Sequence, residues 1–212
     1  MQTFEFGDPS AEVVLVQMVD DHDLKEIEGE FAAIRESFPG KIRLLAVKVN
    51  DWNRDLSPWK ASAVFGNEDF GDGAAATLAE VMTCCTDRSR TYYIGGYSLA
   101  GLFALWAAYQ TDLFEGVAAA SPSIWFPEFV DFMREQKIRT KRVYLSLGDK
   151  EERTRNPIMA SVGTRIREAQ ELLREQSVET TLEWNPGNHF KDAGLRTAKA
   201  FAWVLESGKR GE

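Results

Sequence analysis

The chain has 212 residues, of which 44% are hydrophobic and 27% are charged, and this length is sufficient to bury a substantial core. Its formal net charge is −8, and no basic cluster stands out, which argues against nucleic acid and anionic membrane surfaces as partners. No apolar run approaches the ~20 residues that cross a bilayer, and residues 1–6 lack the form of a signal peptide.

Short apolar runs alternate with longer amphipathic patterns along the first half of the chain. The pattern predicts a helix over residues 23–38, with Asp23 as its N-cap, and a second helix over 74–84. Two buried strands are predicted at residues 13–19 and 42–49, and an irregular stretch at 50–73.

The second half of the chain continues the same alternation. Asn156 and Pro157 have the residue types of a helix start, with Asn as the cap and Pro in the first turn. The predicted strands are 92–94, 117–120, 143–147 and 178–184, and the other predicted helices are 99–109, 127–135 and 193–205. This order predicts an α/β fold, a mostly parallel sheet of about six or more strands with helices on both faces.

In such a sheet, active groups gather beyond the carboxyl ends of the strands. Residues 96–100 (Gly-Tyr-Ser-Leu-Ala) directly follow a predicted strand and directly precede a predicted helix. This is the setting of the G-x-S-x-G nucleophile elbow, with Ala100 in place of the second Gly. We therefore predict Ser98 as a nucleophile and the Leu99 amide as an oxyanion donor. The alternative is a simple strand-to-helix turn with a Ser cap.

The chain has two histidines, which makes a partner base simple to nominate. His189 lies in a loop between the last predicted strand and the last predicted helix, the place where this arrangement holds its histidine. His22 lies in the acidic run 20–23. Metal ligation by His22 is weighed against a solvated helix start, and we favour the latter, so no metal site is predicted.

An acid that orients the imidazole should follow the strand at 143–147. Asp149, Glu151 and Glu152 compete there, and spacing alone does not choose among them. We prefer Glu151, because a strand-Gly-x-x-acid arrangement lets the acid reach back over the strand end, and Asp149 is the second choice. By position, a second oxyanion donor should come from Asp20 or Asp21, after the strand at 13–19.

The segments 95–105 and 114–125, together with Gly148, Glu151 and residues 188–190, resemble the putative-esterase family of α/β-hydrolases. This family includes ferric-enterobactin esterase, esterase D and the mycolyltransferases. The resemblance covers the chain from about residue 90 to the end, and the shorter front leaves the extent of the sheet open. It implies an α/β-hydrolase fold, an ester-cleaving Ser-Glu/Asp-His triad and no cofactor, and it places residues 121–125 beside the site.

We therefore expect a serine esterase that cleaves a small-molecule carboxylic ester through an acyl-enzyme. Only about 20 residues separate Ala120 from Lys141, which leaves little room for a large cap, so we expect no large cap and a rather open site. The candidates for substrate contact are Trp52, Trp59 and Trp125, with Tyr97 beside the nucleophile and Arg54 to meet an anion. For each Trp, a core or surface-anchoring role is the alternative.

Two other functions stay open at this point. A thioesterase, amidase or acyltransferase would use the same triad. A non-catalytic α/β-hydrolase that serves as a binding module would usually have lost one of the three triad residues. The remaining expectations are a single domain over residues 1–212 and, because the neighbouring Cys84 and Cys85 are poorly placed to bridge a fold, a reduced cytoplasmic protein.

Overall fold

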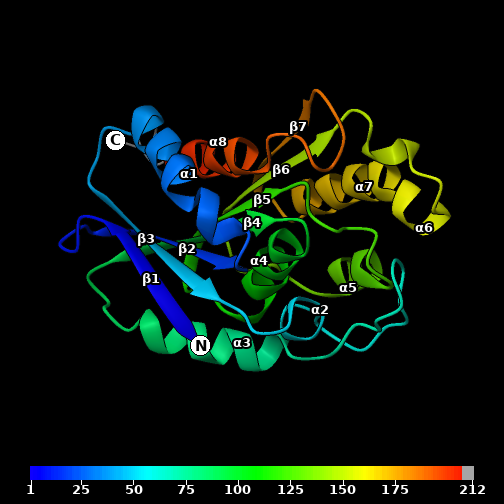
Figure 1. Ribbon diagram of the computed structural model, residues 1–212, viewed down its shortest axis with the longest axis horizontal. Helices are drawn as coiled ribbons and strands as arrows, with labels where there is room; N and C mark the ends of the chain where they lie inside the picture. Colours follow the sequence, from blue (N-terminus) through cyan, green and yellow to red (C-terminus); the bar gives the residue numbers. More distant parts are fainter. Residues whose placement is uncertain (207–212) are drawn as a thin grey trace.

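The computed structural model describes residues 1–206 and contains a seven-stranded sheet of order β1-β3-β2-β4-β5-β6-β7 (Figure 1). Every strand pair is parallel except β1 with β3. The predicted mostly parallel α/β sheet is therefore confirmed. The strands are β1 (Gln2–Gly7), β2 (Val13–Val19), β3 (Ile42–Lys48), β4 (Thr91–Tyr97), β5 (Phe114–Ala120), β6 (Arg142–Gly148) and β7 (Glu179–Asn185).

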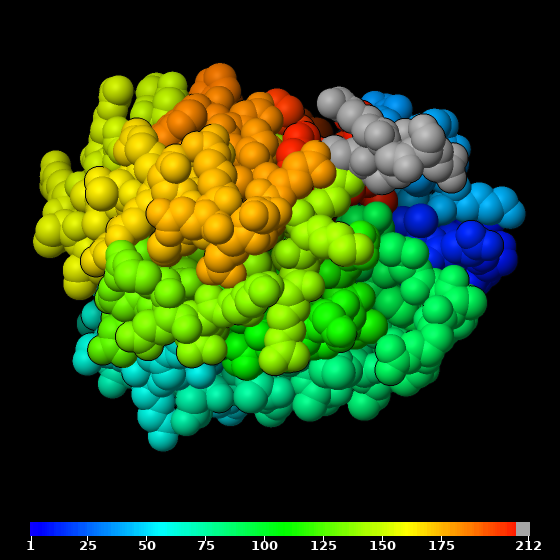
Figure 2. Space-filling view, turned by 180° about the vertical axis from the view of Figure 1, so that it is seen from behind, coloured from blue at the N-terminus to red at the C-terminus, as the bar shows by residue number. Residues whose placement is uncertain are grey.

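Helices cover both faces of the sheet, and each face has its own apolar core. On one face lie α1 (Asp23–Ser37) and α8 (Ala193–Glu206), which contact each other (Figure 1). On the other face lie α3 (Ala74–Cys84), α4 (Leu99–Gln110), α5 (Phe129–Glu135) and α7 (Val162–Glu175). Seen from behind, α7 in yellow to orange lies above the blue-green α3 (Figure 2). Three short helical segments complete the described chain: α2 (Trp52–Asp55), η1 (Glu151–Arg153) and α6 (Pro157–Ala160).

The helix α4 is the best-buried helix of the fold, and this fixes the position of its first residue. Its residues Leu99 to Tyr109 are all buried, and it packs against both β4 and β5. A helix that is apolar on all sides can only be stable inside a core. The loop that enters α4 from β4 is therefore held at a defined place at the carboxyl edge of the sheet.

Three element predictions need correction. The antiparallel edge strand β1 was not predicted, because only every second side chain along it is partly buried and the apolar pattern is weak. The N-cap of α1 is His22 rather than Asp23, and the Asp20 carboxylate accepts the amides of both residues. The helix predicted to start at Asn156 is divided at Ser161, whose amide and hydroxyl both donate to the Ile158 carbonyl.

Within residues 1–206, none of the helices is long and apolar enough to cross a lipid bilayer. Cys84 and Cys85 are both free thiols, the first exposed and the second buried.

Candidate active site

Ser98 occupies a sharp turn between β4 and α4. Its backbone has φ 57° and ψ −122°, a region that non-glycine residues enter only at a cost in energy. The turn is possible because its neighbours are small: a Cβ on Gly96 would lie 2.7 Å from the Cβ of Ala100. Ser98 N donates to Ala120 O at 3.1 Å, which ties the turn to the end of β5. This is the geometry expected of a nucleophile elbow.

The structure brings Ser98, His189 and Glu151 together in one hydrogen-bonded chain. His189 Nε2 lies 3.0 Å from Ser98 Oγ, and His189 Nδ1 lies 2.7 Å from Glu151 Oε2. The three residues come from the start of α4, the loop after β7 and the 3₁₀ turn after β6. The order and contacts are those of a nucleophile, a base and an orienting acid.

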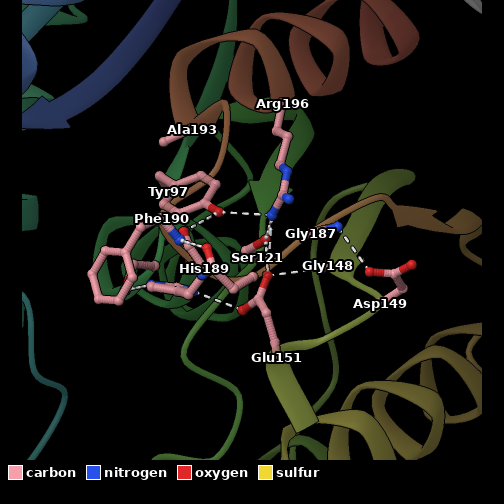
Figure 3. Close-up of polar contacts among 12 residues, drawn as sticks. Tyr97, Ser121, Gly148, Asp149, Glu151, Gly187, His189, Phe190, Ala193 and Arg196 are labelled. Carbon is pink, nitrogen blue, oxygen red and sulfur yellow. Dashed lines mark hydrogen bonds and ion pairs between the residues drawn. The ribbon is translucent and has the colours of Figure 1, made fainter. Parts of the chain in front are cut away.

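The other two candidate acids have different partners. Asp149 Oδ1 accepts the Gly187 amide at 2.8 Å, so this carboxylate braces the loop that carries His189 (Figure 3). Glu152 Oε2 lies 3.5 Å from Arg167 Nη1 in a solvent-exposed ion pair. Glu151 is thus the one of the three whose carboxylate contacts the imidazole.

The Glu151 carboxylate is anchored through one oxygen and presents the other to His189 (Figure 3). Its Oε1 accepts from Ser121 Oγ at 2.8 Å, from Gly148 N at 2.7 Å and from Arg196 Nη1 at 3.2 Å. Burial acts to raise the pKa of Glu151, but the contact with His189 and the Gly148 and Ser121 hydrogen bonds together outweigh it and hold that pKa below its ordinary value. The acid is therefore an anion at neutral pH.

A second network fixes the backbone of the histidine loop. The Tyr97 hydroxyl donates to His189 O at 2.7 Å and accepts from Arg196 Nη1 at 3.0 Å, while Arg196 Nη2 donates to Pro186 O at 3.2 Å. In Figure 3, Arg196 reaches down from α8 toward Tyr97 and Glu151. Tyr97, which we predicted as a substrate contact, instead holds the loop, and burial raises the pKa of its hydroxyl.

A cavity of about 410 Å³ opens beside Ser98 and His189. Trp125 lines it, as predicted, whereas Trp52 and Arg54 do not. Trp52 packs against the core on the α3 and α4 face, and Arg54 forms an ion pair with Asp55 at 2.9 Å. The large and cationic side chains that line the cavity are Phe65, Trp125, Met159, Phe190, Lys150 and Arg153.

The three residues that we predicted as oxyanion donors differ in their surroundings. Leu99 supplies the first amide of α4, one of the helix-start amides that the helix itself leaves without an acceptor. The Asp20 amide donates to Asp23 Oδ2 at 3.2 Å, so it is already engaged. The Asp21 carboxylate pairs with Lys48 at 2.6 Å. Neither Asp20 nor Asp21 lines the cavity.

Residues 1–206 contain no group of three or more His, Cys, Asp or Glu side chains that could hold an ion. His22 is exposed at the start of α1, where its amide donates to Asp20 Oδ1 at 2.7 Å. His22 therefore lies at a solvent-exposed helix start, as we predicted.

The profile of the Putative esterase family matches residues 78–193, more than half of the chain. The chain belongs to this family. The matched segment contains Ser98, Glu151 and His189. Membership makes this esterase a carboxylic ester hydrolase and confirms the resemblance seen in the sequence. A search of curated proteins finds no match for it.

Solved structures share the fold of this esterase at low sequence identity. An IroE-like serine hydrolase from Shewanella oneidensis is 11% identical with a TM-score of 0.76, and the match covers 96% of this chain and 75% of that one. The siderophore hydrolase EstA from Aspergillus nidulans is 18% identical with a TM-score of 0.64, over 95% and 85% of the two chains. The enterobactin esterase FES from Shigella flexneri is 13% identical with a TM-score of 0.66, and the match covers 97% of this esterase but 55% of FES.

Sequence reasoning missed Arg196, although a signal for it exists. Arg196 lies four residues before Ala200 and eight before Val204, which are both buried on α8. An arginine on the apolar face of an amphipathic helix is unusual unless an acid is buried opposite it. The missed residues that take part in the site are Arg196, Phe65, Lys150, Arg153, Met159 and Phe190. The resemblance placed residues 121–125 beside the site, but it did not indicate the contacts of Ser121 with Glu151 and of Ser123 with Ser98.

Proposed function

We propose that this esterase is a serine hydrolase in which Ser98 attacks the ester carbonyl, His189 acts as the base and Glu151 orients the imidazole. The observation that carries the proposal is the continuous contact from Ser98 Oγ to His189 Nε2 at 3.0 Å and from His189 Nδ1 to Glu151 Oε2 at 2.7 Å. Both distances permit proton transfer without rearrangement of the side chains.

The reaction proceeds in two halves. The Ser98 proton moves to His189 Nε2 while Ser98 Oγ bonds to the carbonyl carbon, and the Leu99 amide stabilises the negative charge on the carbonyl oxygen. His189 then protonates the leaving alcohol, which leaves an acyl group on Ser98. A water molecule, deprotonated by His189, releases the acid and restores the serine.

The cavity lining supports an ester with an apolar or aromatic portion that carries negative charge. Phe65, Trp125 and Phe190 offer flat apolar surface beside Ser98, and Lys150 and Arg153 add positive charge in a chain whose net charge is −8. The structural neighbours include siderophore hydrolases, an enterobactin esterase and a ferulic acid esterase. We propose a small-molecule ester of this character as the substrate class.

The test is a panel of matched substrates. A p-nitrophenyl ester, the corresponding thioester and the anilide of one acyl group are compared with the wild-type protein and with Ser98→Ala. We expect the oxygen ester to be turned over fastest and the variant to retain less than about one thousandth of that rate. Full hydrolysis by Ser98→Ala would end the proposal, and a faster thioester or anilide would reassign the reaction.

A further inference from the structure

A second buried hydroxyl lies against the proposed nucleophile. Ser123 Oγ is 3.2 Å from Ser98 Oγ, and Ser123 is 2% exposed. Its amide also donates to Ser98 O at 3.0 Å. Ser123 belongs to the turn after β5, in which the Ile124 amide donates to Pro122 O and the Phe126 amide to Ser123 O. The backbone of this turn therefore fixes Ser123 without help from its hydroxyl.

The direction of the hydrogen bond between the two serines follows from their neighbours. Glu151 is an anion that can only accept, so the proton that joins it to the imidazole lies on His189 Nδ1, and in the neutral ring that acts as the base Nε2 is the acceptor. Ser98 then donates its only hydroxyl proton to His189 Nε2. The proton between the two serines must consequently come from Ser123, so Ser123 Oγ–H donates to Ser98 Oγ.

We propose that Ser123 is a further catalytic residue of this esterase, a donor that stabilises negative charge on Ser98 Oγ as it attacks. This inference rests on the proposed role of Ser98. During the attack the Ser98 proton goes to His189 Nε2, the Oγ–carbon bond forms and the carbonyl electron pair moves onto the carbonyl oxygen. Ser123 keeps its own proton throughout.

This contact favours the transition state over the states on either side of it. A hydrogen bond strengthens as its acceptor gains charge, and Ser98 Oγ is most negative while its proton is leaving. Once the acyl group is attached, the ester oxygen is a weaker acceptor. The effect of losing the Ser123 hydroxyl should therefore fall on the rate of acylation and not on substrate binding.

The experiment measures acylation directly, by the pre-steady-state burst with a p-nitrophenyl ester, in the wild-type protein and in Ser123→Ala and Ser123→Cys. We expect Ser123→Ala to slow acylation about 10- to 100-fold while the dissociation constant of the substrate stays within about twofold. Ser123→Cys keeps a side chain of similar shape with a weaker donor. Its acylation rate should therefore fall between those of the wild-type protein and Ser123→Ala. The control is Ser146→Ala, which removes a buried hydroxyl of β6 that lies outside the hydrogen-bonded chain of Ser98, His189 and Glu151.

The role of Ser123 and the proposed function are contradicted by different results. Wild-type acylation rates in both Ser123 variants would overturn the role of Ser123 even if Ser98→Ala is inactive. A loss shared equally by Ser146→Ala, or confined to the dissociation constant, would also overturn it. Full activity of Ser98→Ala would instead overturn the proposed function on which this inference rests.

Discussion

Arg196 Nη1 lies 3.2 Å from Glu151 Oε1, and the two side chains are 3% and 5% exposed. The pair joins the final helix to the acid that contacts His189 (Figure 3). Such a buried pair adds little net stability compared with apolar residues, but the loss of one partner leaves an uncompensated charge in the interior. The guanidinium of Arg196 is therefore needed for the acid to stay in place.

Arg196→Met should destabilise the fold by about 3–5 kcal/mol, because it leaves the buried Glu151 carboxylate without its cationic partner. Urea unfolding measures this change. The matched control is Arg174→Met, which breaks an exposed pair with Glu171 and should cost at most about 1 kcal/mol. Equal unfolding midpoints for the two variants would contradict the importance of the buried pair.

Glu151→Gln should lower kcat by roughly 10³–10⁴-fold, because an amide cannot hold the imidazole in the required tautomer. Asp149→Asn removes a carboxylate of the same segment that contacts Gly187 and not His189, and we expect it to lower kcat less than about tenfold. Steady-state kinetics on one aryl ester compares them. If Asp149→Asn proved the more damaging of the two, the assignment of the acid would be reversed.

The α1 residue Glu30 offers a test of stability against pH. Burial raises its pKa to about 8, and nearby Gln17 offsets only part of this. Among the residues that the structure describes, no group forms a hydrogen bond with its buried Oε1. Because the folded-state pKa lies above the unfolded value near 4.5, the folded protein binds more protons between these two values, and its stability falls as pH rises from about 5 to about 8.

Glu30→Gln should remove this part of the pH dependence. We expect the variant and the wild type to have similar melting temperatures near pH 5, and the variant to be the more stable at pH 8. Thermal unfolding at the two pH values provides the measurement. Parallel curves for the two proteins across this range would show that folding leaves the pKa of Glu30 unchanged and would contradict the prediction.

Phe190 is 88% exposed although it follows the histidine directly, and it lines the cavity with its ring against that of His189. Phe190→Ala should therefore raise KM for aryl esters about fivefold, which corresponds to a loss of ~1 kcal/mol of binding free energy. The melting temperature should stay unchanged. The control is Leu195→Ala, an exposed apolar residue of α8 outside this cavity. An equal change in KM for both variants would remove Phe190 from the substrate contacts.

The sequence was most informative where chemistry depends on local order. Ser98 could be predicted because the elbow is a contiguous motif between a strand and a helix, and His189 because the chain has only two histidines. Glu151 followed from its place after β6, although spacing alone did not separate it from Asp149. Local patterns of this kind also gave the bounds of most helices and strands.

Residues that act through tertiary packing were beyond that reasoning. Arg196 meets Glu151 across 45 positions of the chain, and no motif connects them. The resemblance placed residues 121–125 beside the site, but it did not indicate that Ser123 would contact Ser98, 25 positions away. Trp52 and Arg54 were expected at the site because the path of residues 50–73 cannot be read from periodicity. The edge strand β1 was missed because a half-exposed strand carries little apolar signal.

The most direct test of Ser98 as the nucleophile is covalent labelling by a fluorophosphonate, followed by intact-protein and peptide mass spectrometry. We expect a single phosphonyl adduct on Ser98, no adduct on Ser98→Ala, and strongly slowed labelling of His189→Ala. Undiminished labelling of Ser98→Ala, or an adduct on another residue together with full esterase activity, would contradict this assignment.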